Sequence, residues 1–91
     1  MVFKTIGDCR RSAEEQRYIW ATLQIWQRLP YARRESIRSL IARVAQTPEE
    51  GRALYDVMVR AAAPSSVSRR TKVPLQRIYA LRRDFYERFE I

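Results

Sequence analysis

The sequence predicts an all-α fold, a single compact domain of five helices. Only two glycines and four prolines occur among its 91 residues, whereas antiparallel sheets need many turn residues. Apolar residues recur at three- and four-residue spacing, and no alternating run is long enough to indicate a strand. Residues 1–11 lack this spacing and contain Gly7. We therefore expect a mobile amino-terminal arm at 1–11 and one helical domain at 12–91.

A serine cap and a proline delimit the first two helices. Ser12 is followed three residues later by Glu15, a capping-box pattern that predicts a helix from about Ala13. This helix should end near Arg28, because Pro30 disfavours helical geometry at the residue before it. The second helix is expected from about Tyr31 to Gln46. The predicted inward residues are Ile19, Leu23 and Trp26 in the first helix, and Ile37, Leu40, Ile41, Val44 and Ala45 in the second.

A threonine cap and two further prolines delimit the remaining helices. Thr47 precedes Pro48-Glu49-Glu50, which combines a cap, a first-turn proline and a glutamate three residues on. The third helix should extend to about Ala62, before Pro64, with Leu54, Val57, Met58 and Ala61 inward. A short fourth helix is expected from Ser65 to Thr71. Lys72-Val73-Pro74 then forms a turn, and the fifth helix runs from Leu75 to about Phe89.

The spacing of apolar residues predicts a helix-turn-helix at about 64–89. Two closely crossing helices need an apolar anchor and a small residue before the turn, and apolar anchors after it. The sequence provides these in the required order: Val67, Ser68, Lys72 at the turn, Val73, Ile78 and Leu81. Phe85 and Phe89 continue the inward face of the fifth helix.

The charge distribution points to a polyanionic partner. The chain has 18 Lys and Arg against 10 Asp and Glu, a net charge of +8. Pro64–Arg83 contains no acid and six bases: Arg69, Arg70, Lys72, Arg77, Arg82 and Arg83. The absence of histidine and the single cysteine argue against an enzyme, a metal site or a cofactor.

The start of the fifth helix would be a recognition helix in the major groove of double-stranded DNA. Its predicted base contacts are Gln76, Arg77, Tyr79 and Ala80, where Gln suits adenine and Arg suits guanine. The predicted phosphate contacts, which give affinity without sequence preference, are Arg69, Arg70, Lys72, Arg82 and Arg83.

Residues from about Leu29 to Phe89 resemble the promoter-reading region four of bacterial sigma factors, and small phage or mobile-element regulators with the same helical arrangement. The resemblance rests on Leu29-Pro30, on EEGRALYDVMV before the motif, and on VSRRTKVPLQRIYAL itself. It implies a DNA-binding transcription regulator. Lys72 replaces the usual turn glycine and Pro74 the usual capping serine or threonine, and no polymerase-core-binding part precedes them. A stand-alone regulator is therefore expected rather than a sigma factor.

Three further expectations concern partners and location. The wide apolar arc of the first helix suggests a homodimer surface at Tyr18, Trp20 and Ile25, although Trp20 at the edge of the core is the alternative. The alternative function is a phage or mobile-element interaction protein that uses the basic helical face to inhibit a host nucleic-acid-handling protein. RNA binding ranks last, because the aromatic residues fall mainly in core positions. One cysteine and no signal peptide or membrane span predict a cytoplasmic protein.

Overall fold

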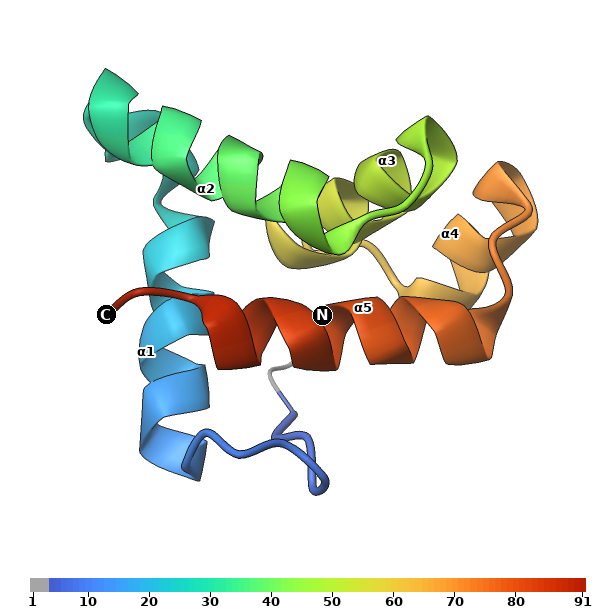
Figure 1. Ribbon diagram of the computed structural model, residues 1–91, viewed down its shortest axis with the longest axis horizontal. Helices are drawn as coiled ribbons and strands as arrows, with labels where there is room; N and C mark the ends of the chain where they lie inside the picture. The colour runs from blue at the N-terminus through green and yellow to red at the C-terminus, as the bar shows by residue number, and fades with distance from the viewer. Residues whose placement is uncertain (1–3) are drawn as a thin grey trace.

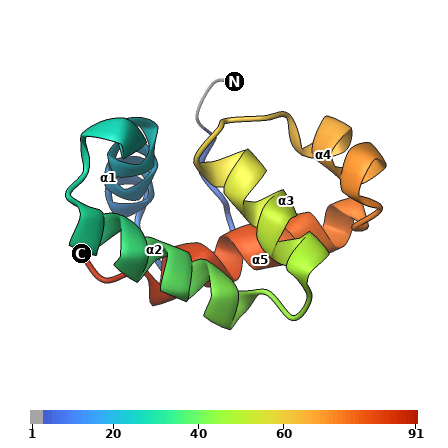
Figure 2. The ribbon, with the colours of Figure 1, turned by 90° about the horizontal axis from the view of Figure 1, so that it is seen from above.

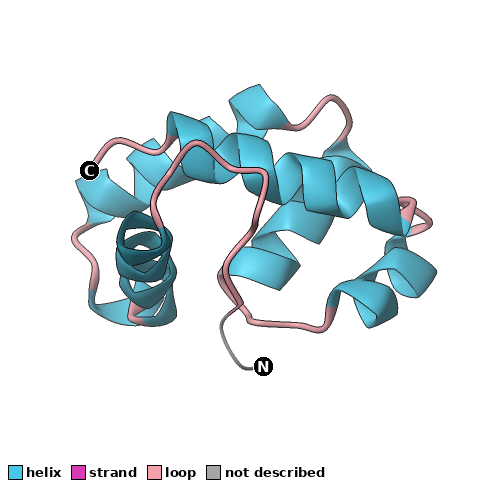
Figure 3. Ribbon diagram, turned by 90° about the horizontal axis from the view of Figure 1, so that it is seen from below, coloured by secondary structure: helices cyan, strands magenta, loops and turns pink. Residues whose placement is uncertain are grey.

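The computed structural model describes residues 4–91 and confirms the all-α fold for that range. The helices are α1 (Ala13–Gln24), the 3₁₀ helix η1 (Trp26–Arg28), α2 (Tyr31–Val44), α3 (Pro48–Met58), α4 (Pro64–Thr71) and α5 (Leu75–Arg88). No strand occurs in the described range (Figure 3). The first three residues of the expected arm lie outside it.

The long helix α5 lies at the centre of the packing. It contacts α2, α3 and α4, with α1 near its carboxyl end and α4 near its amino end (Figures 1 and 2). The inward face of α5 is fully buried at Ile78, Leu81 and Phe85. Of the predicted inward residues, those within the first two helices and Leu54, Val57 and Met58 of α3 are buried. Ala45 and Ala61 are only half-buried, because they lie beyond the ends of α2 and α3.

Both predicted amino-terminal caps are present. The Ser12 hydroxyl accepts from the Glu15 amide at 3.1 Å, and the Glu15 carboxylate accepts from the Ser12 amide at 3.0 Å. The Thr47 hydroxyl accepts from the Glu50 amide at 3.1 Å. The Glu50 carboxylate reaches one residue further than a capping box requires and accepts from the Gln46 amide at 2.9 Å.

Several helix boundaries differ from the predicted ones. The first helix ends at Gln24 and continues as η1, and the second ends at Val44 rather than Gln46. The largest difference is in α3, which ends at Met58 instead of about Ala62. There the chain reverses through a left-handed residue, Ala61 with φ 55°, and the Ala62 amide donates to the Asp56 carbonyl at 3.0 Å. Pro64 begins α4, because proline at the first helical position loses no intrahelical bond.

The segment from residue 4 to residue 11 is anchored, which differs from the mobile arm expected from the sequence. The buried Gln16 side chain accepts from the Ile6 amide at 2.8 Å and donates to the Ile6 and Arg11 carbonyls at 3.1 and 3.0 Å. Arg11 donates to the carbonyl of Tyr86 at 3.0 Å and to that of Phe89. The segment therefore holds the carboxyl end of α5.

Arg11→Met should lower the free energy of unfolding by about 1–3 kcal/mol, because two carbonyls at the end of α5 lose a charged donor. Urea unfolding followed by circular dichroism measures this. Arg10→Met is the matched control: the Arg10 side chain is 88 % exposed and lies 3.5 Å from Glu87, so it should cost no more than about 0.5 kcal/mol. Equal losses in the two variants would contradict the anchoring role of Arg11.

None of the helices between residues 4 and 91 is both long enough and apolar enough to cross a membrane.

Candidate nucleic-acid interface

The turn between α4 and α5 is built around a left-handed residue at the position predicted for it. Lys72 has φ 67° and ψ 11°, and its amide donates to the Ser68 carbonyl at 2.9 Å. The Ser68 hydroxyl donates to the Val73 carbonyl at 2.6 Å, which closes the turn from the other side. A lysine in this conformation costs about 1 kcal/mol relative to glycine. Lys72 therefore places a cation at the turn in a conformation that is strained for a residue other than glycine.

The apolar positions of the predicted motif all face inward. Val67, Val73, Ile78 and Leu81 are buried, and Ser68 is half-buried between the two helices. Pro74 precedes α5 without any side-chain cap, as its identity implies. The first amides of α5 therefore remain available to an outside acceptor.

Gln76 and Tyr79 form the outward face of the first two turns of α5. Gln76 is exposed and Tyr79 is 45 % exposed, whereas Ala80 is half-buried. The Arg82 guanidinium lies 5.4 Å from the centre of the Tyr79 ring, close enough for a cation–π interaction. Arg82 and Tyr79 thus present a cation and an aromatic ring side by side.

Arg69 and Lys72 are exposed cations at the end of α4 and in the turn. Among the described residues, neither they nor Arg82 forms an ion pair with a carboxylate. The charges of these three side chains are therefore not neutralised by a carboxylate of the described residues.

Arg77 differs from the expectation of a free base-contacting side chain. Its Nε and Nη2 atoms donate to Glu50 Oε2 and Oε1 at 2.9 and 3.0 Å, a two-bond pairing across α5 and the start of α3. The Arg77 side chain is only 30 % exposed and that of Glu50 only 14 %. Hydrogen bonding from Arg77, followed by that from the Gln46 amide, lowers the pKa of the Glu50 carboxyl. In this conformation the edge of Arg77 that would read guanine is occupied.

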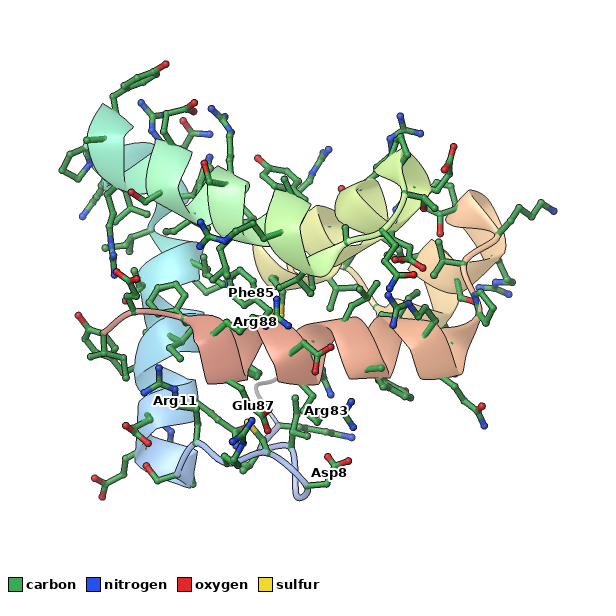
Figure 4. The ribbon with its side chains drawn as sticks, viewed as in Figure 1. Asp8, Arg11, Arg83, Phe85, Glu87 and Arg88 are labelled. Atoms are coloured by element: carbon green, nitrogen blue, oxygen red, sulfur yellow. The ribbon has the colours of Figure 1, made fainter. Side chains whose placement is uncertain are left out.

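Two predicted phosphate contacts are also paired with acids. Arg70 Nη1 lies 2.9 Å from Asp56 Oδ2, a buried carboxylate on α3. Arg83 lies 3.5 Å from Asp84 and 3.4 Å from Asp8 (Figure 4). The nearby charge of Asp84 is the main cause of the raised pKa of Arg83. Residues 64–83 include no acid, but the fold places acidic side chains from other parts of the sequence beside their arginines.

The anchored amino-terminal segment borders the outward face of α5, which sequence reasoning missed. A shallow groove of about 450 Å³ separates the two, and Lys4 lies on its rim. The groove is lined by Lys4, Thr5, Ile6 and Asp8 on one side and by Gln76, Tyr79, Ala80, Arg82 and Arg83 on the other. Lys4 therefore joins the cations of this face.

The three residues predicted for a dimer surface do not share one environment. Trp20 is 9 % exposed and belongs to the core, so it is not available to a second copy. Tyr18 and Ile25 are half-exposed, and Tyr31 at the start of α2 is more exposed still. The sequence could not separate these cases because the apolar arc of α1 is wide.

Within residues 4–91, no group of three or more His, Cys, Asp or Glu side chains is arranged to hold a metal ion. Comparisons with protein-family models, with curated proteins and with solved structures find no match to this chain.

Proposed function

We propose that this protein is a sequence-specific transcription regulator that binds duplex DNA, with α4 and α5 acting as a helix-turn-helix. The observation that carries the proposal is the left-handed turn at Lys72. It joins two helices whose apolar positions face the core, while Gln76, Tyr79 and unpaired cations face outward. This is the division of roles that a recognition helix requires.

The dimensions of α5 suit this role. Its 14 residues extend about 21 Å at 1.5 Å per residue, whereas the major groove of B-DNA is about 12 Å wide. The first turns of α5 would then lie against base edges, and its later turns would emerge beside a sugar–phosphate backbone.

The contacts are assigned from exposure and pairing. Gln76 would donate to and accept from adenine, and Tyr79 would contact a thymine methyl group or a sugar. Arg69, Lys72 and Arg82 would meet phosphates, with Lys4 as an added contact from the amino-terminal segment. Arg77 positions α5 through Glu50 rather than reading a base.

Two variants separate base contacts from phosphate contacts. After a preferred duplex is selected from a random pool, Gln76→Ala should lose about 1–3 kcal/mol of discrimination at one base pair. Arg69→Gln/Lys72→Gln should bind every duplex more weakly and flatten the plot of log K against log salt by about 1.8, since each phosphate that is no longer neutralised accounts for about 0.9. Fluorescence anisotropy at several salt concentrations measures both effects.

An outcome with no preferred duplex, or one in which Gln76→Ala keeps the full preference, would contradict the base-reading role of α5. Weak binding that ignores sequence, together with tight capture of one host protein, would instead support an interaction protein that uses the same basic face. The pairing of Arg70, Arg77 and Arg83 with acids lowers the free charge of this face for either function, so the binding measurements have to separate the two.

If the regulator binds paired half-sites, a homodimer is expected. Tyr18 lies on α1 and Ile25 caps the carboxyl end of that helix, and both side chains are half-exposed. Sedimentation with and without the selected duplex tests this, and Ile25→Glu should keep the protein monomeric if α1 is the contact.

A further inference from the structure

A second basic groove lies between α2 and the carboxyl end of α5. Its lining includes Arg33, Arg43 and Arg88, together with the hydroxyl-bearing Ser36 and Ser39. The groove has a volume of about 320 Å³. None of these side chains belongs to the face formed by Gln76 and Tyr79.

None of the three arginines forms an ion pair with a described carboxylate, and Arg33 is held in place by a ring and a backbone carbonyl. Arg43 and Arg88 are exposed and form no ion pair with any described carboxylate. Arg33 lies 5.0 Å from the centre of the Phe89 ring and donates through Nη2 to the Glu90 carbonyl at 3.3 Å. The other nitrogens of its guanidinium remain available. Glu90, which is exposed, is the one acid that lines the groove within residues 4–91.

The spacing of these cations fits a chain of phosphates better than a single anion. Arg33 and Arg43 are ten residues apart on α2, which is about 15 Å along the helix. Measured along the axis of B-DNA, that length covers about four phosphates of one strand, which carries one charge per about 3.4 Å of axis. Serine hydroxyls between the arginines add the neutral donors that commonly bind phosphate oxygens.

The position of Arg88 connects this groove with the proposed recognition helix. Figure 4 shows Arg88 on the α2 side of α5, with Asp8, Arg83 and Glu87 on the side of the amino-terminal segment. Arg88 is the last residue of α5. A duplex that receives the first turns of α5 in its major groove would have its backbone beside the last turns, because α5 is longer than the groove is wide.

We propose that the α2–α5 groove, through Arg33, Arg43 and Arg88, binds the sugar–phosphate backbone of the same DNA at a site beyond the contacts of α4 and the start of α5. This inference rests on the proposed function. In it, the groove adds to the affinity for DNA but does not distinguish one base sequence from another.

The test compares two double variants on the selected duplex, extended to about 30 base pairs so that it spans both surfaces. Arg43→Gln/Arg88→Gln should flatten the plot of log K against log salt by about 1.8 and leave the ranking of duplex sequences unchanged. Arg28→Gln/Arg60→Gln removes the same charge at exposed arginines outside the groove and should leave the slope unchanged. Circular dichroism and thermal unfolding verify that both variants fold.

The possible results separate DNA binding itself from the additional contact in the α2–α5 groove. If the wild type binds no duplex, the proposed function itself fails. If the wild type binds and the groove variant has the same slope as the control, the second contact is absent while the proposed function stands. Calorimetry with sodium pyrophosphate in place of DNA tests whether the groove is instead a site for a small anion. Pyrophosphate binding that the groove variant loses, with an unchanged DNA slope, would overturn the assignment to a nucleic-acid backbone.

Discussion

Phe85→Ala is expected to lower the free energy of unfolding by about 3–5 kcal/mol, a large part of the stability of so small a domain. Phe85 is completely buried in the last turn of α5, and its ring lies 5.7 Å from that of Phe89 and 6.5 Å from that of Tyr86. Removing the ring leaves a cavity that neighbours on other helices cannot fill without moving. Urea unfolding with and without DNA measures the loss.

Tyr79→Ala is the matched control, because it removes an aromatic ring from the opposite face of the same helix. Tyr79 is exposed, and we expect a change within about 0.5 kcal/mol in stability together with a clear loss of DNA affinity. Together, the Phe85→Ala and Tyr79→Ala variants test which face of α5 is buried in the core. A large loss of stability from Tyr79→Ala, with little from Phe85→Ala, would show that the helix is rotated and would remove the basis for the contacts assigned here.

Glu50→Gln is expected to change stability and DNA affinity in opposite directions. The variant weakens the two charged hydrogen bonds to Arg77, so the free energy of unfolding should fall by about 1–2 kcal/mol. It also removes a negative charge beside α5 and releases Arg77 toward the DNA. Affinity should therefore rise several-fold at low salt, and the slope of log K against log salt should steepen by about 0.9 for one new phosphate contact.

The pH dependence of stability gives an independent measure of the same pair. The pKa of Glu50 is lowered in the folded protein, so its stabilisation is present above its ordinary pKa of 4.5 and is lost as pH falls through the lower folded value. The wild type should lose more stability than Glu50→Gln between about pH 5 and the lowered pKa. Glu15, whose pKa is also lowered, is retained in both proteins and cancels in the difference.

Glu49→Gln provides the control for charge alone, since Glu49 is the exposed neighbour of Glu50 at the start of α3. It should weaken stability by no more than about 0.5 kcal/mol and leave the salt slope unchanged. Equal effects of the two variants on DNA affinity would mean that Glu50 acts only through its charge and that Arg77 stays where it is.

The number and order of the helices follow from local chemistry, and for that reason they could be predicted. Ser12 and Thr47 cap the helices that begin after them, and the turn at Lys72 lies where the spacing of Val67 and Ile78 required it. The early end of α3 could not be predicted. It depends on a left-handed alanine, Ala61, at a position where no glycine in the sequence indicates such a conformation.

The candidate site was predicted less completely, because electrostatic pairing depends on residues that are distant in the sequence. Gln76 and Tyr79 are outward as the helical period implies. Glu50 is 27 positions from Arg77 and Asp8 is 75 positions from Arg83, so no window along the chain could reveal either pair. Glu50 has an adequate local explanation as a helix-start residue, and this concealed its second role.

A nuclear magnetic resonance titration of the isotope-labelled protein with its selected duplex tests whether the outward face of α5 binds DNA. We expect the largest chemical-shift changes at the Gln76 side-chain amide, the Tyr79 ring and the amides around Lys72, with little change at Arg60, which lies outside both grooves. Changes confined to α1, or saturation with no change along the outward face of α5, would contradict it.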